Sequence, residues 1–152
     1  MRHLTISVDD DLADTFDRLV KEKGYGNRSE AFRDLLRTAI GDTRIQEGAA
    51  KHCVGVLSYV YNHHERQLAK RLMTMQHDHH DVTVSTMHAH LDHDNCIETV
   101  ILRGQTEAVV RFAQAVIAQS GVRHGQFHPI PIEIESPSAK QHAHMHARPP
   151  SI

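Results

Sequence analysis

Two histidines and a cysteine near the middle of the chain have the spacing of a metal site. His88 and His90 lie in Val82–Leu91, a stretch rich in β-branched residues whose alternation predicts a strand. Both imidazoles then project from the same face. Turn-forming residues follow at 92–95, and the apolar run from Ile97 predicts a second strand, so Cys96 returns beside His90. The pattern predicts two imidazoles and one thiolate that converge at the closed end of a hairpin.

These donor types favour a late transition metal without naming it. Imidazole nitrogen and thiolate sulfur suit zinc, nickel and copper, and such ligands bind nickel(II) more tightly than manganese, iron or cobalt, but copper(II) more tightly still. The alternative is a chance grouping on a solvated surface, because the chain has 15 histidines. Further histidines are assigned to the surface or to weaker outer sites: His63, His64, His79, His80 and His93.

Length and composition indicate an ordinary globular protein. The chain has 152 residues, 39% hydrophobic residues and a formal net charge of −2, enough for one domain or two small ones. No apolar run approaches the roughly 18 residues of a membrane span, and the N-terminus lacks the apolar segment of a signal peptide. We therefore expect a cytoplasmic protein without a membrane partner. Of its two cysteines, Cys53 is expected to fill the core and Cys96 to act as a ligand.

The first 45 residues predict one short strand and two helices. Apolar and polar residues alternate from His3 to Val8, Asp9–Asp11 cap and open a helix that Gly24 ends, and Asn27 caps a second helix that ends at Gly41. Such a strand has no partner in its own chain, so it must pair with a copy of itself. This arrangement resembles the ribbon-helix-helix fold of DNA-binding repressors such as MetJ and Arc.

The resemblance implies a DNA interface on this head. His3, Thr5 and Ser7 would face base edges, where hydroxyl groups can donate and accept hydrogen bonds. The backbone N–H groups of Arg28 and Ser29, at the positive end of the second helix, would hold a phosphate. Residues 1–45 carry eight Lys/Arg against nine Asp/Glu, so the head lacks a strong basic footprint and we expect weak, salt-sensitive binding unless a ligand or oligomerisation improves it.

The remaining chain predicts a small α+β domain. Residues 42–51 carry no sustained apolar period and are typical of a linker, with the head ending at about residue 45. The elements that follow are a strand at 52–61, a helix at 62–76, the two hairpin strands, a helix at 106–119 and a strand at 126–134. This βαββαβ order is that of the ferredoxin-like fold, in which two helices cover one face of an antiparallel sheet.

The two halves together resemble the nickel-responsive transcriptional regulators of the NikR family. The resemblance spans residues 2–128 and rests on Gln-His-Asp-His-His-Asp at 76–81, His-Ala-His at 88–90, Asp-Asn-Cys at 94–96, Val-Leu-Ser-Tyr-Val-Tyr at 56–61 and Gly-Val-Arg-His-Gly at 121–125. It implies an ACT-like second domain, a homotetramer built as a dimer of dimers, one Ni(II) per chain, and nickel-promoted operator binding that represses nickel uptake.

Carried over residue by residue, the family's nickel ligands fall on His88, His90 and Cys96 of one chain and on His77 of another. Spacing agrees that His77 is not a same-chain ligand, because seven extended residues from Asp81 to His88 span about 23 Å. The family's second cation contact falls on Glu30 and Asp34, four residues apart on one helix face. His3 stands where the family often has a basic residue, which leaves the operator sequence open.

The sequence is also compatible with three alternative functions. The first is a regulator that responds to zinc, copper or cobalt. The second is a zinc hydrolase, for which Glu98 is the one evident general base. The third is a ribbon-helix-helix antitoxin with a partner-binding C-terminal half. The predicted organisation is a DNA-binding head at 1–45, a linker at 46–51, a metal-binding and tetramerisation domain at 52–135, and a disordered His/Pro-rich tail at 136–152.

Overall fold

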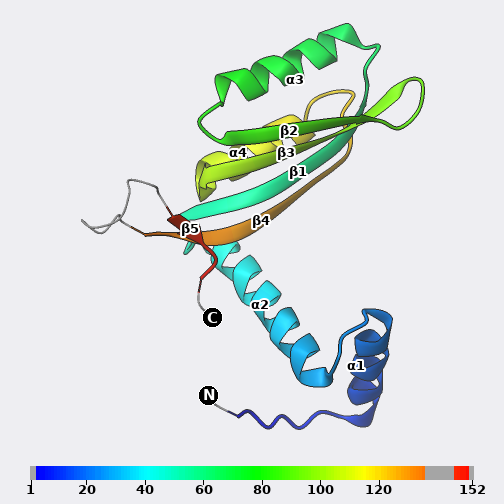
Figure 1. Cartoon of the computed structure of the whole chain (residues 1–152), viewed down its shortest axis with the longest axis vertical. Coiled ribbons are helices and arrows are strands. Elements are labelled where there is room, and N and C mark those ends of the chain that lie inside the picture. Colours follow the sequence, from blue (N-terminus) through cyan, green and yellow to red (C-terminus); the bar gives the residue numbers. More distant parts are fainter. Residues whose placement is uncertain (1–2, 136–145, 151–152) are drawn as a thin grey trace. The chain divides into compact units, whose positions relative to one another are not determined.

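The computed structural model describes residues 3–135 and 146–150, which belong to two compact units, 1–40 and 41–152. Figure 1 shows the elements in order. These are α1 (Asp10–Glu22), α2 (Arg28–Gln46), β1 (His52–Asn62), α3 (Arg66–Asp78), β2 (Thr83–His90), β3 (Asn95–Gln105), α4 (Thr106–Ile117), β4 (Arg123–Glu135) and β5 (His146–Arg148).

The two head helices begin at the predicted caps. The Asp9 carboxylate accepts a hydrogen bond from the backbone N–H of Leu12 at 2.9 Å, and the Asn27 side chain accepts one from the N–H of Glu30 at 2.9 Å. The predicted end of the second helix at Gly41 is wrong, because α2 continues to Gln46 and absorbs much of the expected linker. A glycine inside a helix costs only about 1 kcal/mol, and the chain turns instead at Gly48, whose φ is +67°.

The first unit leaves a large apolar surface uncovered. Residues 3–9 form no strand with any other described residue. Leu4, Ile6 and Val8 remain 75%, 56% and 50% exposed. Together with both helices this segment lines an apolar groove, formed by Ile6, Val8, Leu12, Phe16, Phe32, Leu35 and Leu36 among others. The isolated head therefore lacks the cover that a strand with this pattern requires.

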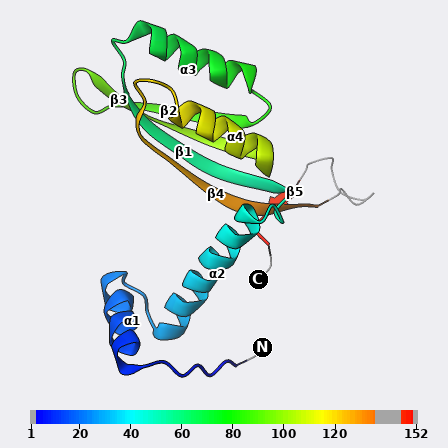
Figure 2. The ribbon, with the colours of Figure 1, turned by 180° about the vertical axis from the view of Figure 1, so that it is seen from behind.

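The second unit is an antiparallel sheet in the order β2-β3-β1-β4-β5. β1 lies between β3 and β4, with Leu57 opposite Val100 on one side and opposite Phe127 on the other. Figure 2 shows α4 in front of this sheet and α3 above α4. The predicted α+β class and ferredoxin-like βαββαβ order are confirmed.

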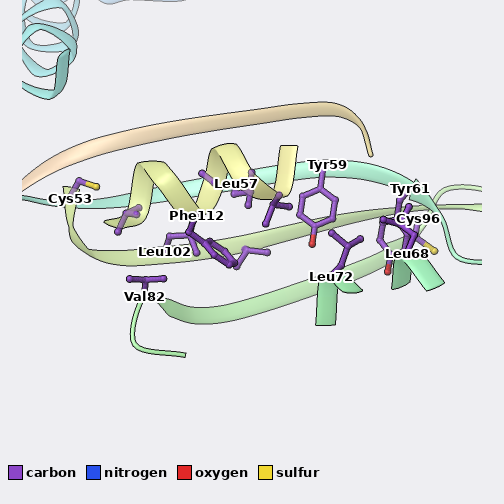
Figure 3. Packing of buried hydrophobic residues seen from close by; sticks show 14 residues of the cluster. Cys53, Leu57, Tyr59, Tyr61, Leu68, Leu72, Val82, Cys96, Leu102 and Phe112 are labelled. Carbon is purple, nitrogen blue, oxygen red and sulfur yellow. The ribbon is translucent and has the colours of Figure 1, made fainter. Parts of the chain in front are cut away.

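One face of the sheet carries the hydrophobic core. Every second residue of β1 from Cys53 to Tyr61 is buried, as is every second residue of β3 from Cys96 to Leu102. These residues pack with both helices in one cluster, shown in Figure 3: Leu57, Tyr59, Leu68, Leu72, Val100, Val109, Phe112 and Val116 among others. The expectation that Cys53 fills the core is confirmed, since it is fully buried.

The C-terminal residues add a strand that the sequence does not predict. β5 pairs antiparallel with the end of β4, where Ile134 lies opposite Ala147. Residues 136–145 and 151–152, which belong to the tail expected to be disordered, lie outside the described residues. Among the described helices, none combines the length and apolarity needed to cross a membrane.

Candidate metal centre

Strand register places the predicted donors in two adjacent rows on the buried face of the sheet. In the first row His88 of β2 lies opposite Glu98 of β3, which lies opposite Tyr59 of β1. In the second row His90 lies opposite Cys96, which lies opposite Tyr61. The rows fall on one face because residues two apart on a strand point the same way. The hairpin predicted from the sequence therefore has the expected pairing of His90 with Cys96.

The structure brings three donors together at the end of these rows. The Cys96 Sγ lies 3.3 Å from the His90 Nδ1 and 3.2 Å from the Nδ1 of His63, which follows β1. The ligand atoms of these residues all lie within 4.8 Å of one another. A zinc or nickel ion with bonds of about 2.0–2.3 Å needs nitrogen and sulfur donors gathered at this scale. We call His63, His90 and Cys96 the inner cluster.

The surroundings of the inner cluster change the protonation of two of its members. Burial raises the pKa of the fully buried Cys96 thiol, and the Asp92 and Glu98 carboxylates raise it further. The pKa of His63 is lowered, first by loss of solvation and then by the neighbouring imidazoles of His64 and His90. The free thiol is therefore protonated at neutral pH and must release its proton to bind a metal, whereas a neutral His63 is ready to bind.

His88 takes a different position from the one that a three-ligand hairpin site requires. Its ring centroid lies 5.3 Å from that of His90, but its Nδ1 lies 3.5 Å from the Glu98 Oε2 and 3.5 Å from the Tyr61 hydroxyl oxygen. Among the described residues, the ligand atoms gathered within 4.8 Å beside His90 and Cys96 are those of His63, and His88 is not in this group.

Glu98 is the centre of a buried hydrogen-bond network. Only 7% of it is exposed, and its carboxylate accepts hydrogen bonds from the Tyr59 hydroxyl at 2.6 Å, from the Tyr61 hydroxyl at 3.2 Å and from the Gln76 amide. Burial raises the pKa of both tyrosines, and Glu98 raises it further, so both hydroxyls remain donors. The network joins α3 to the rows of the metal centre, and a carboxylate held by so many donors is poorly placed to act as a general base.

His77 stands apart from these donors. It lies in the last turn of α3 and belongs to neither group of metal-ligand atoms found among the described residues. Its neighbour Gln76 reaches the sheet, where its amide oxygen accepts a hydrogen bond from the Thr86 hydroxyl at 2.7 Å. Among the described residues, the inner cluster therefore gathers three donors, and His77 is not one of them.

The sequence did not predict that His63 would lie beside Cys96 or that Glu98 would be a buried hydrogen-bond acceptor. The sequence pattern contains a signal for both positions. The strand at 52–61 was predicted, and its end could have been aligned with Cys96 at the start of the next predicted strand. Tyr61 pairs with Cys96. His63 is two residues after Tyr61, so its side chain is expected on the same face of the sheet as the Cys96 side chain. The prediction that His63 lies at the surface or in a weaker outer site did not use this pairing between strands far apart in the sequence.

The predicted DNA-contacting residues of the head are all exposed: His3, Thr5, Ser7, Arg28 and Ser29. The Arg28 guanidinium pairs with the Asp17 carboxylate through two hydrogen bonds. This pairing lowers the pKa of Asp17. Arg28 and Ser29 are the first residues of α2, so their backbone N–H groups have no partner within the helix.

The two carboxylates expected to contact a second cation lie on α2. Asp34 accepts a hydrogen bond from the Tyr25 hydroxyl at 2.5 Å. Glu30 belongs to the first turn of the helix, and its backbone N–H is the one capped by Asn27. Neither carboxylate belongs to a group of gathered metal-ligand atoms among the described residues.

Comparison with known proteins matches both halves of the chain. Residues 54–130 match the model of the NikR C-terminal nickel-binding domain, and residues 2–43 match that of the ribbon-helix-helix proteins of the copG family. Proteins named nickel-responsive regulator from Brucella abortus biovar 1, Brucella suis biovar 1 and Brucella melitensis biotype 1 are each 48% identical over 132 residues, which is 87% of this chain and 100% of each relative.

Proposed function

Because this chain belongs to the family of nickel-responsive regulators, we propose that it is a transcriptional repressor of nickel uptake whose binding to operator DNA is promoted by Ni(II). Its membership makes it a regulator and not an enzyme. The observation that carries the proposal is the gathering of imidazole and thiolate donors at one end of a sheet whose chain also carries a ribbon-helix-helix head.

The donor set fits one nickel ion per chain. Imidazole nitrogens and a thiolate are ligands that Ni(II) accepts, and Cys96 and His90 are already within 3.3 Å. We infer that His88, His90 and Cys96 hold the metal together with His77 of a second chain, and that His88 turns from Glu98 towards the metal when it binds. His63, whose Nδ1 lies 3.2 Å from the Cys96 Sγ, would support the same centre. The metal would supply the link between subunits.

The shared ligand has a direct test by mixing. His77→Ala and Cys96→Ala proteins should each lose the high-affinity site. In a hybrid oligomer, one site can draw Cys96 from the first parent and His77 from the second, so equilibrium dialysis with nickel should recover part of the binding. Verified hybrids that recover none, from parents that are folded and oligomeric, would contradict a site shared between chains.

Assembly into a homotetramer, a dimer of dimers, is supported by two uncovered apolar surfaces. One is the head groove, where Ile6 and Val8 are 56% and 50% exposed. The other is the sheet face opposite the core, where Val56, Met87 and Ile130 are 38%, 67% and 39% exposed. We propose that paired heads read double-stranded DNA with His3, Thr5 and Ser7 and hold phosphates at the start of α2, in the cytoplasm. Glu30 and Asp34 are proposed to contact an alkali-metal cation, which is not a nickel site.

The proposed domain roles follow the same division. The head at 1–45 reads DNA, and residues 52–135 bind metal and hold the tetramer together. The decisive experiment is a gel-shift titration with metal-free protein, a DNA fragment selected from a random pool in the presence of nickel, and one metal at a time. Nickel should promote the shift more strongly than cobalt or zinc at equal free metal. A shift that needs no metal, or that zinc or copper promotes and nickel does not, would refute nickel sensing.

A further inference from the structure

We propose that the chain carries a second, solvent-exposed transition-metal site formed by His64, His93 and Asp94, which we call the outer site. Its ligand atoms all lie within 4.8 Å of one another. The His64 Nε2 lies 3.5 Å from the Asp94 Oδ1, and the ring centroids of His64 and His93 lie 5.6 Å apart. An ion with bonds of about 2 Å holds neighbouring donors roughly 3 Å apart, so small rotations of these side chains complete the site.

The two loops that supply the donors are fixed to each other by backbone hydrogen bonds. The N–H of His63 donates to the Asp94 carbonyl at 3.1 Å, which joins the loop after β1 to the turn between β2 and β3. Asp92 stabilises the turn between β2 and β3, because its Oδ1 accepts hydrogen bonds from the backbone N–H groups of Asp94 and Asn95 at 2.8 Å each. The backbone of the outer site is therefore largely ordered before a metal binds, which reduces the entropy cost of binding.

The outer site differs chemically from the inner cluster. It offers two imidazole nitrogens and a carboxylate oxygen, without sulfur, and the His64 and Asp94 side chains are 56% and 59% exposed. Water would fill the remaining coordination positions. Such a set suits divalent nickel, cobalt, copper or zinc, and it should bind more weakly than the thiolate centre because it lacks the soft ligand.

The outer site lies directly beside the inner cluster, and His63 connects the two. The His63 ring contacts both, with its centroid 4.2 Å from that of His64 and its Nδ1 3.2 Å from the Cys96 Sγ. The inference goes beyond the proposed function, since the outer site does not depend on which metal the thiolate centre takes or on DNA binding.

The test counts nickel ions by equilibrium dialysis of the full chain with His142, His144 and His146 changed to alanine, which removes the histidines of the tail. This parent should bind two equivalents per chain, and the combination His64→Ala with His93→Ala should bind one. His93→Ala alone should weaken the second equivalent by about tenfold or more, since even the loss of a ligand's supporting group has this effect. The matched control is His124→Asn with His128→Ala, which changes two other exposed histidines and should keep both equivalents.

Absorption spectra with Co(II) distinguish the two sites. The first equivalent should give a sulfur-to-metal charge-transfer band that Cys96→Ser abolishes, and the second equivalent should add none. The band should survive in the His64→Ala and His93→Ala combination, which shows that the variant is folded around the inner cluster. The outer site is wrong if the parent binds only one equivalent, or if the combination binds as many ions as the control. Failure of nickel sensing would instead leave these counts unchanged.

Discussion

The Glu98 network allows a quantitative prediction for the metal-free protein. Glu98→Ala removes the acceptor of the buried Tyr59 and Tyr61 hydroxyls, which are 1% and 5% exposed. Each buried donor left without a partner costs about 1–3 kcal/mol. Because the Tyr61 hydroxyl keeps the His88 Nδ1 at 3.5 Å, the gross loss is at most about 6 kcal/mol. Release of the buried carboxylate from a poorly solvated position offsets part of it. We therefore expect the free energy of unfolding to fall by about 2–4 kcal/mol, a large share of the ~5–15 kcal/mol of a typical domain.

Urea denaturation of the metal-free protein measures this change, at one chain concentration because oligomer stability depends on it. Glu98→Gln keeps the shape and one carbonyl acceptor, so it should lose less than Glu98→Ala. Thr99→Ala, on the next residue of β3 and the opposite face of the sheet, is the matched control and should stay within about 0.5 kcal/mol of the parent. A loss for Glu98→Ala no larger than that of the control would refute the network as a source of stability.

Three further changes test other parts of the molecule. Thr5→Ala should weaken binding to a selected operator by about 1–3 kcal/mol in fluorescence anisotropy while nickel binding is unchanged; equal affinity would exclude the ribbon as the reader of bases. Leu72→Ala, at a site that is 2% exposed, should cost about 2–5 kcal/mol in the same urea assay, whereas Met73→Ala, at a site that is 72% exposed, should cost little. Nickel affinity should fall as the pH drops below roughly 6.5, because protons then compete with the metal for the imidazoles. Protons also compete for the Cys96 sulfur, since the pKa of its thiol is raised. Equilibrium dialysis that shows undiminished affinity at about pH 5 would contradict an imidazole-thiolate centre.

Local patterns predicted much of the fold because each depends on neighbours in the sequence. The caps at Asp9 and Asn27 form as expected, and the turn at 92–95 returns Cys96 to His90. The end of α2 was missed because packing in the second unit, where Ile45 contacts the core cluster, outweighs the small cost of Gly41. β5 was missed because its pairing with β4 joins strands separated by residues that carry no strand pattern.

Residue spacing within the hairpin could not predict which imidazoles lie beside the Cys96 thiol. His88 and His90 are equivalent by period, yet the residue paired with His88 is a buried carboxylate and the residue paired with His90 is the thiol. Accordingly the His88 Nδ1 lies 3.5 Å from the Glu98 Oε2, and the Nδ1 of His63 lies 3.2 Å from the Cys96 Sγ. Only the alignment of β1 with β3, which are more than 30 residues apart in the chain, decides which imidazole meets the sulfur.

The same register fixes both the core and the metal centre, and this links metal binding to folding. Leu57 and Tyr59 enter the core on the face where Cys96 and Glu98 point, so a slip of one residue between β1 and β3 would expose the core and move the thiol to the opposite face. We therefore expect metal to bind with high affinity only to the correctly paired sheet. At a free metal concentration about 100 times the dissociation constant, this selectivity stabilises the folded chain by about 2.7 kcal/mol, comparable with the Glu98 network. A core substitution such as Leu72→Ala that lowers metal-free stability should consequently be rescued in part by nickel, whereas Cys96→Ser should lose that rescue.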